Sequence, residues 1–555
     1  MCDPLEASAL QLAWISQRVE KRAGARAART RRAQVRVCRR TRAVRRALES
    51  SATQSSRAIG SAQPRPVEIS RQRSKRTAIV IGCALAAALA FSGHTSGQTY
   101  PQTDLTAQVD ELFAEWDTVD SPGAVVGIFK AGRIIYARGY GVANLDYGIP
   151  LVPQSVLRIG SISKQFVAMC IAILAEQEKL SFDDDIRTYL PEMPDYGEPI
   201  TIRHLLHHTS GIREYLTLVE LIGKPEGSGF GYTTRELLDL LARQQELNFR
   251  PGDEFSYTNS GYFLLAEIVT RVSGMPASAF ASENVFDPLG MKDTRFYDDP
   301  DAIIPNLSMG YSPKRDGGYR LDILRSEVIG DLGVVTTIED FLRWDNNFYE
   351  NRLGKGTQDL IETMFMRGRT NDGDELSYAL GLEFGSYRGL RTMGHGGSAV
   401  GYVAEFLQFP DQRFSVVILS NSSSFRPGRL ARKITDLYLA DQLEEPPVSR
   451  DQARPRATRP EVVALPIDEL EAFAGDFYSD ELDYFYSFRV REGILQLELR
   501  GDRADLVPYV SDRFGWGRRE LTFLRDDSGA VSGFTLDAGN VRDLKFRRVE
   551  GRVPR

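Results

Sequence analysis

Leu157-Arg-Ile-Gly-Ser161-Ile-Ser-Lys164-Gln-Phe166 runs into an apolar segment that predicts a buried helix from Ser161 to Lys179. Ser161 and Lys164 form the only Ser-x-x-Lys pattern in the chain. Residues three apart share one face of a helix, so the serine hydroxyl and the lysine amine are expected to touch. Burial would disfavour the charged ammonium, and a partly neutral lysine could accept the serine proton. The spacing alone equally fits Ser161 as a helix N-cap beside a surface lysine.

A second candidate element is Tyr257-Thr-Asn259, which lies in a Gly- and Ser-flanked segment before an apolar helix. A phenol and an amide two residues apart can face one cavity from a loop. Tyr349-Glu-Asn351 has the same pattern, but it follows a predicted helix at its polar end, where a structural role is the better interpretation.

The third element is Gly394-His395-Gly-Gly397-Ser398, which we expect just before a strand at residues 401–410. Glycine lets a ligand approach the backbone closely. A strand-edge N–H in this segment, paired with that of Ser161, would form an oxyanion hole.

Three histidines cluster elsewhere, in Arg203-HLLHHTSGI. Adjacent helical positions point in different directions, and no acidic residue completes a zinc-binding pattern there, so we interpret these histidines as structural. His204, His207 and His208 are these three residues.

Outside these motifs, the hydrophobic pattern predicts a sheet assembled from both ends of the chain. Apolar strands near residues 123–144 form a hairpin, helical patterns dominate residues 161–365, and strands return at 401–410 and 413–423. Beyond residue 466, short alternating segments predict a small antiparallel barrel or sandwich. The expected helices in the middle of the chain include residues 161–179, 234–245, 261–273 and 337–349.

Five ordered motifs give the chain a family resemblance. They are Leu157-RIGSISKQF, Leu205-LHHTSGI, Phe255-SYTNSGY, Gly330-DLGVVTTIEDFLRW and Gly394-HGGSAVGY. Together they resemble the serine beta-lactamase-related family, which includes class C beta-lactamases, D-alanyl-D-alanine carboxypeptidases, D-aminopeptidases and related esterases. The similarity covers roughly residues 105–440. It implies an α/β fold of the beta-lactamase/transpeptidase type, in which a sheet region and a helical region enclose the site, while the tail is similar to the lipocalin-like domains of some relatives.

The resemblance also implies roles for individual residues. Ser161 would be the nucleophile, Lys164 its proton acceptor, Tyr257 the proton shuttle and Asn259 a positioning amide. No metal or organic cofactor is expected. The substrate-binding set would be Asn259, His395, Gly397 and Ser398.

One residue departs from the family pattern. His395 stands where many members carry a lysine, and a histidine is only partly charged near pH 7. A permanently charged lysine helps to hold a substrate carboxylate, so we expect esterase or D-amino-acid peptidase activity rather than efficient beta-lactamase activity. The alternative is a non-catalytic protein that keeps the cleft to bind cell-wall peptides.

Charge divides the chain into two parts. Residues 1–76 carry 19 Lys and Arg against 5 Asp and Glu, whereas the remainder carries 50 against 70. An acidic body argues against nucleic acid as a partner. The family resemblance implies a small molecule or a short peptide as the substrate. The apolar run at residues 77–91 follows a basic flank and resembles a signal peptide, which predicts export to the periplasm or beyond, or an inner-membrane anchor if it is uncleaved.

Cys170, in the buried helix, is expected to be a core residue.

These patterns divide the chain into five regions. They are a basic prefix that is disordered or wrongly assigned to the protein (1–76), a signal peptide or anchor (77–98), a beta-lactamase-like serine hydrolase domain (105–442), a Pro- and Arg-rich linker (443–466) and an antiparallel β-barrel domain (467–555).

Overall fold

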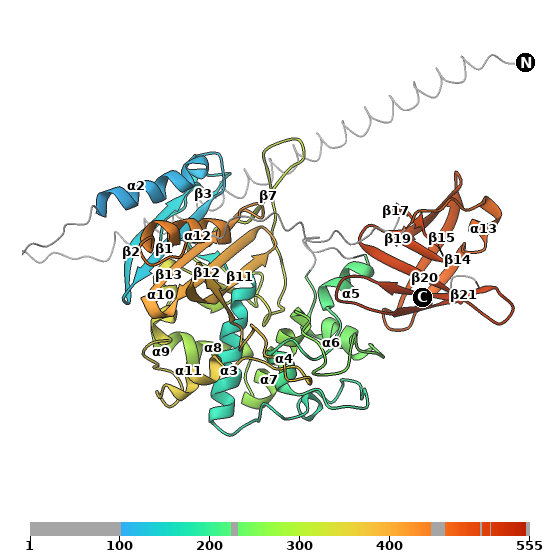
Figure 1. Ribbon diagram of the computed structural model, residues 1–555, viewed down its shortest axis with the longest axis horizontal. Helices are drawn as coiled ribbons and strands as arrows, with labels where there is room; N and C mark the ends of the chain where they lie inside the picture. Colours follow the sequence, from blue (N-terminus) through green and yellow to red (C-terminus); the bar gives the residue numbers. More distant parts are fainter. Residues whose placement is uncertain (1–101, 224–230, 446–460, 500–501, 511, 551–555) are drawn as a thin grey trace, which may run out of the picture. The chain divides into compact units, whose positions relative to one another are not determined.

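The computed structural model describes residues 102–223, 231–445, 461–499, 502–510 and 512–550 (Figure 1). The predicted basic prefix (1–76), the predicted signal segment (77–98) and most of the predicted linker lie outside these residues. All described residues fall in one compact unit of the chain, Gln98–Arg555.

A six-stranded antiparallel sheet joins the two ends of the first domain, as the sequence predicts. Its first and last segments are neighbours, because β1 pairs with β13 from Ala124 opposite Ser420 to Lys130 opposite Phe414. The order in space is β10-β11-β12-β13-β1-β2. The strands are β1 (Ala124–Lys130), β2 (Arg133–Tyr140), β10 (Glu383–Tyr387), β11 (Leu390–Ala399), β12 (Tyr402–Phe409) and β13 (Phe414–Ser420).

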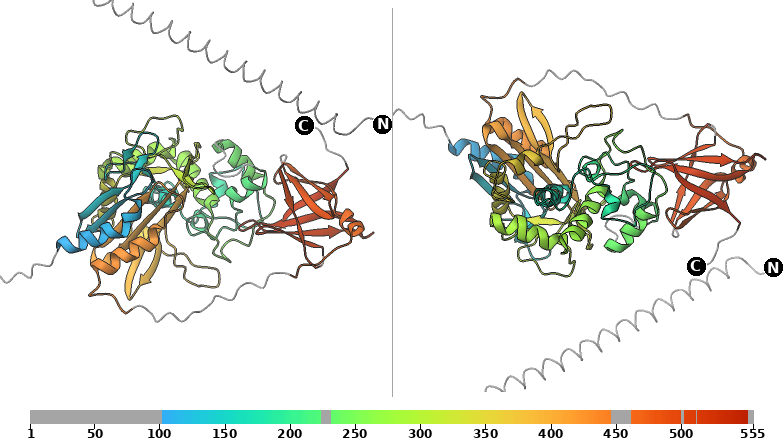
Figure 2. Two further views of the ribbon diagram at one scale, coloured as in Figure 1. Left: turned by 90° about the horizontal axis from the view of Figure 1, so that it is seen from above. Right: turned by 90° about the horizontal axis from the view of Figure 1, so that it is seen from below.

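Both faces of this sheet are covered, so its central strands are apolar on both sides. Val126 and Ile418 pack in a core with α2 (Gln102–Phe113) and α12 (Pro427–Tyr438). Val125 belongs to the other core, which contains α10 (Ile338–Asn347) and the helical region. Figure 2 shows α2 and α12 together on one side of the sheet.

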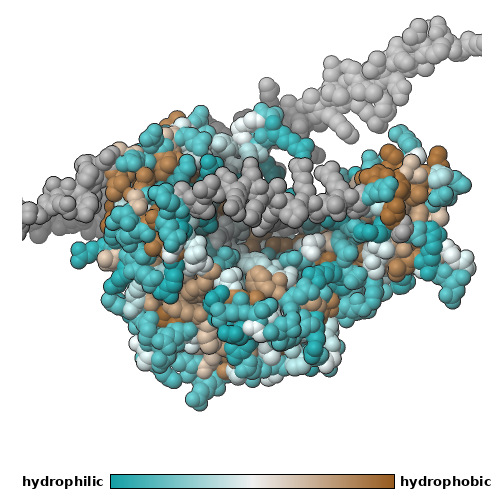
Figure 3. Space-filling model, viewed as in Figure 1, coloured by the Kyte–Doolittle hydropathy of each residue, from teal (hydrophilic) through white to brown (hydrophobic). Residues whose placement is uncertain are grey.

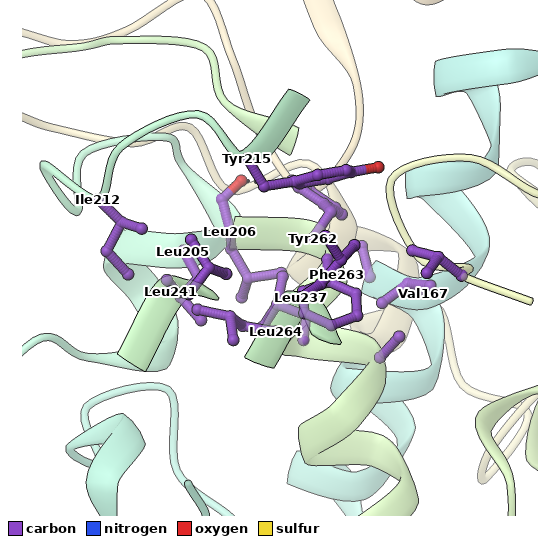
Figure 4. Packing of buried hydrophobic residues seen from close by; sticks show 14 of the residues in the cluster. Val167, Leu205, Leu206, Ile212, Tyr215, Leu237, Leu241, Tyr262, Phe263 and Leu264 are labelled. Atoms are coloured by element: carbon purple, nitrogen blue, oxygen red, sulfur yellow. Dashed lines mark hydrogen bonds between the residues drawn. The ribbon is translucent and has the colours of Figure 1, made fainter. Parts of the chain in front are cut away.

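The helical region surrounds α3 (Lys164–Glu176), whose residues are buried from Lys164 to Leu174. Cys170, in its centre, is 1% exposed and packs in the core. A cluster of leucines and aromatic rings fills the space between the neighbouring helices (Figure 4). These helices are α4 (Ile202–Leu206), α5 (Tyr215–Leu221), α6 (Thr234–Ala242), α7 (Asn259–Ser273), α8 (Ala277–Ala281), α9 (Asp287–Leu289) and α11 (Asp359–Met364).

Short strands complete the first domain. They form three small sheets, β5-β9-β6, β3-β4 and β7-β8. Their bounds are β3 (Val142–Asn144), β4 (Ile149–Pro150), β5 (Leu157–Arg158), β6 (Arg295–Phe296), β7 (Tyr311–Pro313), β8 (Tyr319–Leu321) and β9 (Val334–Thr336).

Two predictions at the site were wrong in detail. The helix does not begin at Ser161, because Gly160–Ser163 forms a 3₁₀ turn that precedes α3. The segment from Gly394 to Ser398 does not precede a strand but lies within β11, which pairs with β12. Glycine has a low strand propensity, so the glycines in this segment conceal the strand from a pattern-based prediction.

The C-terminal part is a nine-stranded antiparallel sheet that is nearly closed into a barrel, a lipocalin-like arrangement that agrees with the prediction. Its order is β17-β16-β15-β14-β22-β21-β20-β19-β18. Buried aromatic rings, among them Phe488, Phe523 and Phe534, pack against one another and account for the apolar alternation in these strands. The elements are α13 (Ile467–Glu471), β14 (Gly475–Ser479), β15 (Tyr484–Arg491), β16 (Ile494–Leu499), β17 (Asp502–Asp505), β18 (Val507–Pro508), β19 (Arg513–Trp516), β20 (Arg519–Arg525), β21 (Val531–Asp537) and β22 (Leu544–Val549).

Hydrophilic side chains cover most of the face shown in Figure 3. Among the described residues, no helix combines the length and the apolar character that crossing a membrane requires.

Candidate active site

Ser161 lies in the 3₁₀ turn at the end of β5, where its side chain stays partly accessible. The preceding residue, Gly160, has a φ of +54°, a left-handed conformation that favours glycine. A Cβ on Gly160 would lie 2.5 Å from the backbone nitrogen of Ser398. Glycine therefore lets the serine turn press directly against β11.

Lys164 is fully buried and contacts the Ser161 hydroxyl through its side-chain amine. Its Nζ donates to Ser161 Oγ over 3.1 Å, to Asn259 Oδ1 over 2.7 Å and to the main-chain oxygen of Asp331 over 3.0 Å. Burial lowers the pKa of this amine below its ordinary value of 10.5, and the negative charges of Asp331 and Glu214 only partly offset that effect. The surface-lysine interpretation of the motif is therefore wrong.

Tyr257 contributes a phenol from the loop before α7. Its ring lies 4.9 Å from Lys164 Nζ, and the ring of His208 packs against it at 4.3 Å between centroids. Burial raises the pKa of Tyr257, while the nearby Ser161 hydroxyl acts in the opposite direction. Within the described part of the chain, the buried Tyr257 hydroxyl makes no hydrogen bond of ordinary geometry. It is thus a neutral phenol beside the serine, free to bond an incoming group.

Asn259 is the first residue of α7, and a carboxylate fixes its orientation. Its main-chain N–H donates to Glu214 Oε2 over 2.5 Å, and its Nδ2 donates to Glu214 Oε1 over 3.2 Å. The amide oxygen must then face Lys164, which can only donate. Asn259 therefore links the lysine to a second buried carboxylate.

His395, in β11, lies at the same site but does not carry the partial charge that we expected. Its Nδ1 is 2.5 Å from the carbonyl oxygen of Gly396, and its Nε2 is 3.0 Å from the hydroxyl of Tyr378. Burial and the nearby Lys164 lower the pKa of His395 to about 4. The ring is therefore neutral near pH 7, with Nδ1 donating to the carbonyl and Nε2 accepting from Tyr378.

Gly397 and Ser398 bring the edge of β11 to the serine turn. A Cβ on Gly397 would lie 1.9 Å from the main-chain oxygen of Ile159. The pairing between β10 and β11 ends at Gly394, so the following residues of β11 have no partner strand on that side within the described part of the chain. The backbone N–H groups of Ser161 and Ser398 thus belong to two segments in direct contact, as an oxyanion hole requires.

A comparison with known protein families identifies the family to which this chain belongs. The model of the family described as Beta-lactamase matches residues 109–440, which is more than half of the chain. This protein belongs to the Beta-lactamase family.

Individual relatives agree with the Beta-lactamase assignment. The chain is 28% identical over 303 residues to a D-aminopeptidase of Gluconobacter oxydans, covering 55% of this chain and 56% of that protein. It is 28% identical over 323 residues to a D-aminopeptidase of Brucella canis, covering 58% and 60%. The matches thus span less than two thirds of these relatives. Among solved structures, the octameric penicillin-binding protein homologue from Pyrococcus abyssi shares the fold, with a TM-score of 0.54, 23% identity and coverage of 80% of this chain and 99% of that one.

The histidine cluster of this Beta-lactamase family member supports the structure around the site. His204 Nδ1 accepts from Thr201 N at the start of α4, and both ring nitrogens of His207 contact main-chain oxygens. His208 Nδ1 accepts from the N–H of Thr258, next to Tyr257. The competing Tyr349 lies elsewhere, with its ring beneath the guanidinium of Arg413.

Several residues at the site were not predicted from the sequence. Glu214 and Asp331 surround Lys164 with negative charge, and Tyr378 fixes His395. Asp331 lies inside the motif Gly330-DLGVVTTIEDFLRW, but nothing in its spacing indicates that it is buried beside a lysine.

The C-terminal part of the chain also reaches the site. Asn540, in the turn after β21, donates from Nδ2 to the main-chain oxygen of Tyr257 over 2.6 Å. Its own main-chain oxygen accepts from the N–H of Glu214 over 3.1 Å and from Asn248 Nδ2 over 2.8 Å. Asn540 thus bonds the backbone of two residues whose side chains form the site.

Proposed function

We propose that this chain is a serine hydrolase that works through an acyl-enzyme, with Ser161 as its nucleophile. The observation that carries the proposal is the 3.1 Å contact between the Ser161 hydroxyl and the fully buried Lys164 amine. Because burial lowers the pKa of this amine, a neutral fraction is available to accept a proton, which a solvated lysine would not supply.

The proposed reaction has two halves. In the first, Ser161 Oγ attacks the carbonyl carbon of an ester or amide while Lys164 takes the hydroxyl proton. The N–H groups of Ser161 and Ser398 receive the oxyanion. The carbon–nitrogen or carbon–oxygen bond then breaks, and the leaving group receives a proton through the Tyr257 phenol. In the second half, water gives a proton to the same groups and attacks the acyl-enzyme, which releases the carboxylic acid and restores Ser161.

We further propose D-amino-acid amides, short peptides or esters as the substrate class. The relatives that carry the name D-aminopeptidase support this choice. The neutral ring of His395 supports it too, because a neutral residue at this place gives a penicillin carboxylate no counter-charge.

We also propose that the protein is exported. The basic flank and apolar run at residues 71–91 have the order of a signal peptide, which favours a periplasmic or extracellular product. N-terminal sequencing of the mature protein tests whether the segment is cleaved. A mature chain that still contains Arg31 would refute both cleavage and a true start inside the basic prefix.

The decisive experiment is covalent labelling of the purified protein with a fluorescent fluorophosphonate. We expect stoichiometric labelling of wild type and of Ser181→Ala, an exposed serine, and none of Ser161→Ala. Hydrolysis of D- and L-alanine p-nitroanilide is then compared, and the D-enantiomer is expected to react faster. If the wild-type protein stays unlabelled but still binds cell-wall peptides, the result supports the alternative of a non-catalytic binding protein.

A further inference from the structure

Asp331 is a fully buried carboxyl group that the proposed reaction does not use. The hydroxyl of Tyr215 donates to its Oδ2 over 2.9 Å, while its Oδ1 has no hydrogen-bond partner among the described residues. Tyr215 lies at the edge of the leucine cluster, with its hydroxyl pointing away from the labelled leucines (Figure 4). The main-chain oxygen of the same Asp331 accepts from Lys164 Nζ over 3.0 Å. One residue therefore both anchors the lysine and places a carboxyl near it.

Most other titratable groups around Lys164 are uncharged, so few of them can stabilise its ammonium form as the Asp331 carboxyl can. Tyr257 and Tyr262 are neutral because burial raises their pKa values. His208 and His395 are neutral because burial lowers theirs. Glu214, whose two oxygens bond Asn259, is the other acidic group in the described part of the chain whose charge acts on Lys164 and Asp331. The titratable groups facing Lys164 and Asp331 are Glu214 and Tyr215 at the start of α5, His208 after α4, Tyr257 and Tyr262 at α7, and His395 in β11.

We propose that Asp331 is a positioning residue of the hydrolase, and that its carboxyl, oriented by Tyr215, stabilises the ammonium that Lys164 becomes when it takes the Ser161 proton. This inference rests on the proposed function. A carboxylate and an ammonium attract strongly where water is excluded, so the field of Asp331 opposes the effect of burial on the lysine. Without it, Lys164 would remain neutral more readily but would hold the transferred proton less well.

Burial raises the pKa of Asp331, and the Tyr215 hydroxyl and Lys164 lower it. The hydroxyl of Tyr215 therefore helps to keep the carboxyl ionised. In Tyr215→Phe, Asp331 should ionise only at higher pH, so this variant should resemble Asp331→Asn at low pH and wild type at high pH.

The test measures Lys164 and the reaction separately. Lysine labelled with ¹³C at Cε is followed by NMR from pH 5 to 11 in the full protein, with the Lys164 signal assigned by its absence in Lys164→Arg. In Asp331→Asn, the Lys164 midpoint should fall by about one pH unit or more. The matched control is Asp345→Asn, which changes another fully buried carboxyl, and its Lys164 midpoint should equal that of wild type.

The pH dependence of acylation by a p-nitrophenyl ester gives the functional result. In Asp331→Asn, the acidic limb of kcat/KM should move to lower pH, and kcat should fall about 10-fold or more with little change in KM. An unchanged Lys164 midpoint in a folded Asp331→Asn protein would overturn the inference. If that variant does not fold, a Tyr215→Phe protein whose acidic limb of kcat/KM coincides with that of wild type overturns it instead. A wild-type protein that never acylates refutes the proposed function, while the NMR midpoints still decide whether Asp331 acts on Lys164.

Discussion

The hydroxyl of Tyr378 donates to Nε2 of His395 over 3.0 Å, and this bond fixes the state of the ring. Because the other ring nitrogen already donates to the carbonyl of Gly396, the histidine has no free N–H for a substrate anion. The pKa of about 4 keeps the ring uncharged over the pH range in which most enzymes work.

We therefore expect poor turnover of β-lactams, whose carboxylate would meet a neutral ring. D-alanine p-nitroanilide, which has no carboxylate, should give a kcat/KM at least about 100-fold above that of nitrocefin, about the value of one charge-assisted hydrogen bond. Both rates are measured at pH 7.5 on the same preparation. Rapid nitrocefin hydrolysis would contradict this assignment of His395.

Replacement of Lys164 by arginine should slow acylation strongly while keeping the positive charge. Arginine stays protonated in proteins and cannot accept the Ser161 proton. Loss of a general base typically costs 10²- to 10⁴-fold, so we expect kcat to fall by about that factor. Stopped-flow acylation with a p-nitrophenyl ester measures it, and a variant as fast as wild type would exclude Lys164 as the base.

Two neighbouring glycines in β11 should respond differently to alanine. A Cβ on Gly397 would lie 1.9 Å from Ile159 O, whereas the nearest atom to a Cβ on Gly396 is Glu405 Oε2 at 3.5 Å, an ordinary contact. Gly397→Ala should therefore lose about 2 kcal/mol or more of stability and most fluorophosphonate labelling, because the strand must move away from Ser161. Gly396→Ala should retain both properties. Equal behaviour of the two variants would show that close approach of β11 is not required.

Asn540 should matter for catalysis although it lies in the C-terminal part of the chain. Asn540→Ala removes one hydrogen bond to the backbone of Tyr257, and a bond of this kind contributes about 1 kcal/mol. We expect kcat to fall about 5-fold, with a far-UV circular dichroism spectrum like that of wild type. Ser532→Ala, an exposed position on β21, serves as the control. A fully active Asn540→Ala protein would assign this contact to packing alone.

Asp345 should make stability depend on pH at a place outside the active site. It is fully buried, it accepts from Gln408 Nε2 and Ser415 Oγ, and burial raises its pKa to about 6. The native state then holds a proton between pH 3.8 and about 6 that the unfolded state releases, so stability falls as the pH rises through this window. The total loss is about 3 kcal/mol at most.

Asp345→Asn should remove that loss, because the amide oxygen can still accept both bonds. Urea unfolding at pH 4 and pH 7.5 measures the difference, and the variant should gain stability over wild type only at the higher pH. A gain of the same size at both values would point to packing rather than to the carboxyl.

The sequence was informative where the chemistry is local. Ser161 and Lys164 are three residues apart, so a turn of helix brings them together whatever surrounds them, and the apolar residues after them predict burial. Asn259 follows from its place before an apolar helix. The β11 segment was missed because its strand pattern is interrupted by glycines that serve close packing.

Charge state and long-range partners could not be predicted. The neutral state of His395 depends on burial and on Tyr378, 17 residues earlier in the chain, and no spacing rule links the two residues. Asp331 reaches Lys164 across a separation of 167 residues, and Asn540 reaches Tyr257 across 283. A single sequence contains no periodic signal for contacts of this kind.

The pairing of β1 with β13 has a consequence for biosynthesis. Ala124 lies opposite Ser420, so the central sheet cannot close until almost the whole first domain has left the ribosome. The segment that presses on Ser161 belongs to the same late-arriving half. A nascent or truncated chain therefore carries a serine with no oxyanion hole beside it, and the reactive centre is assembled only when synthesis of that domain is finished.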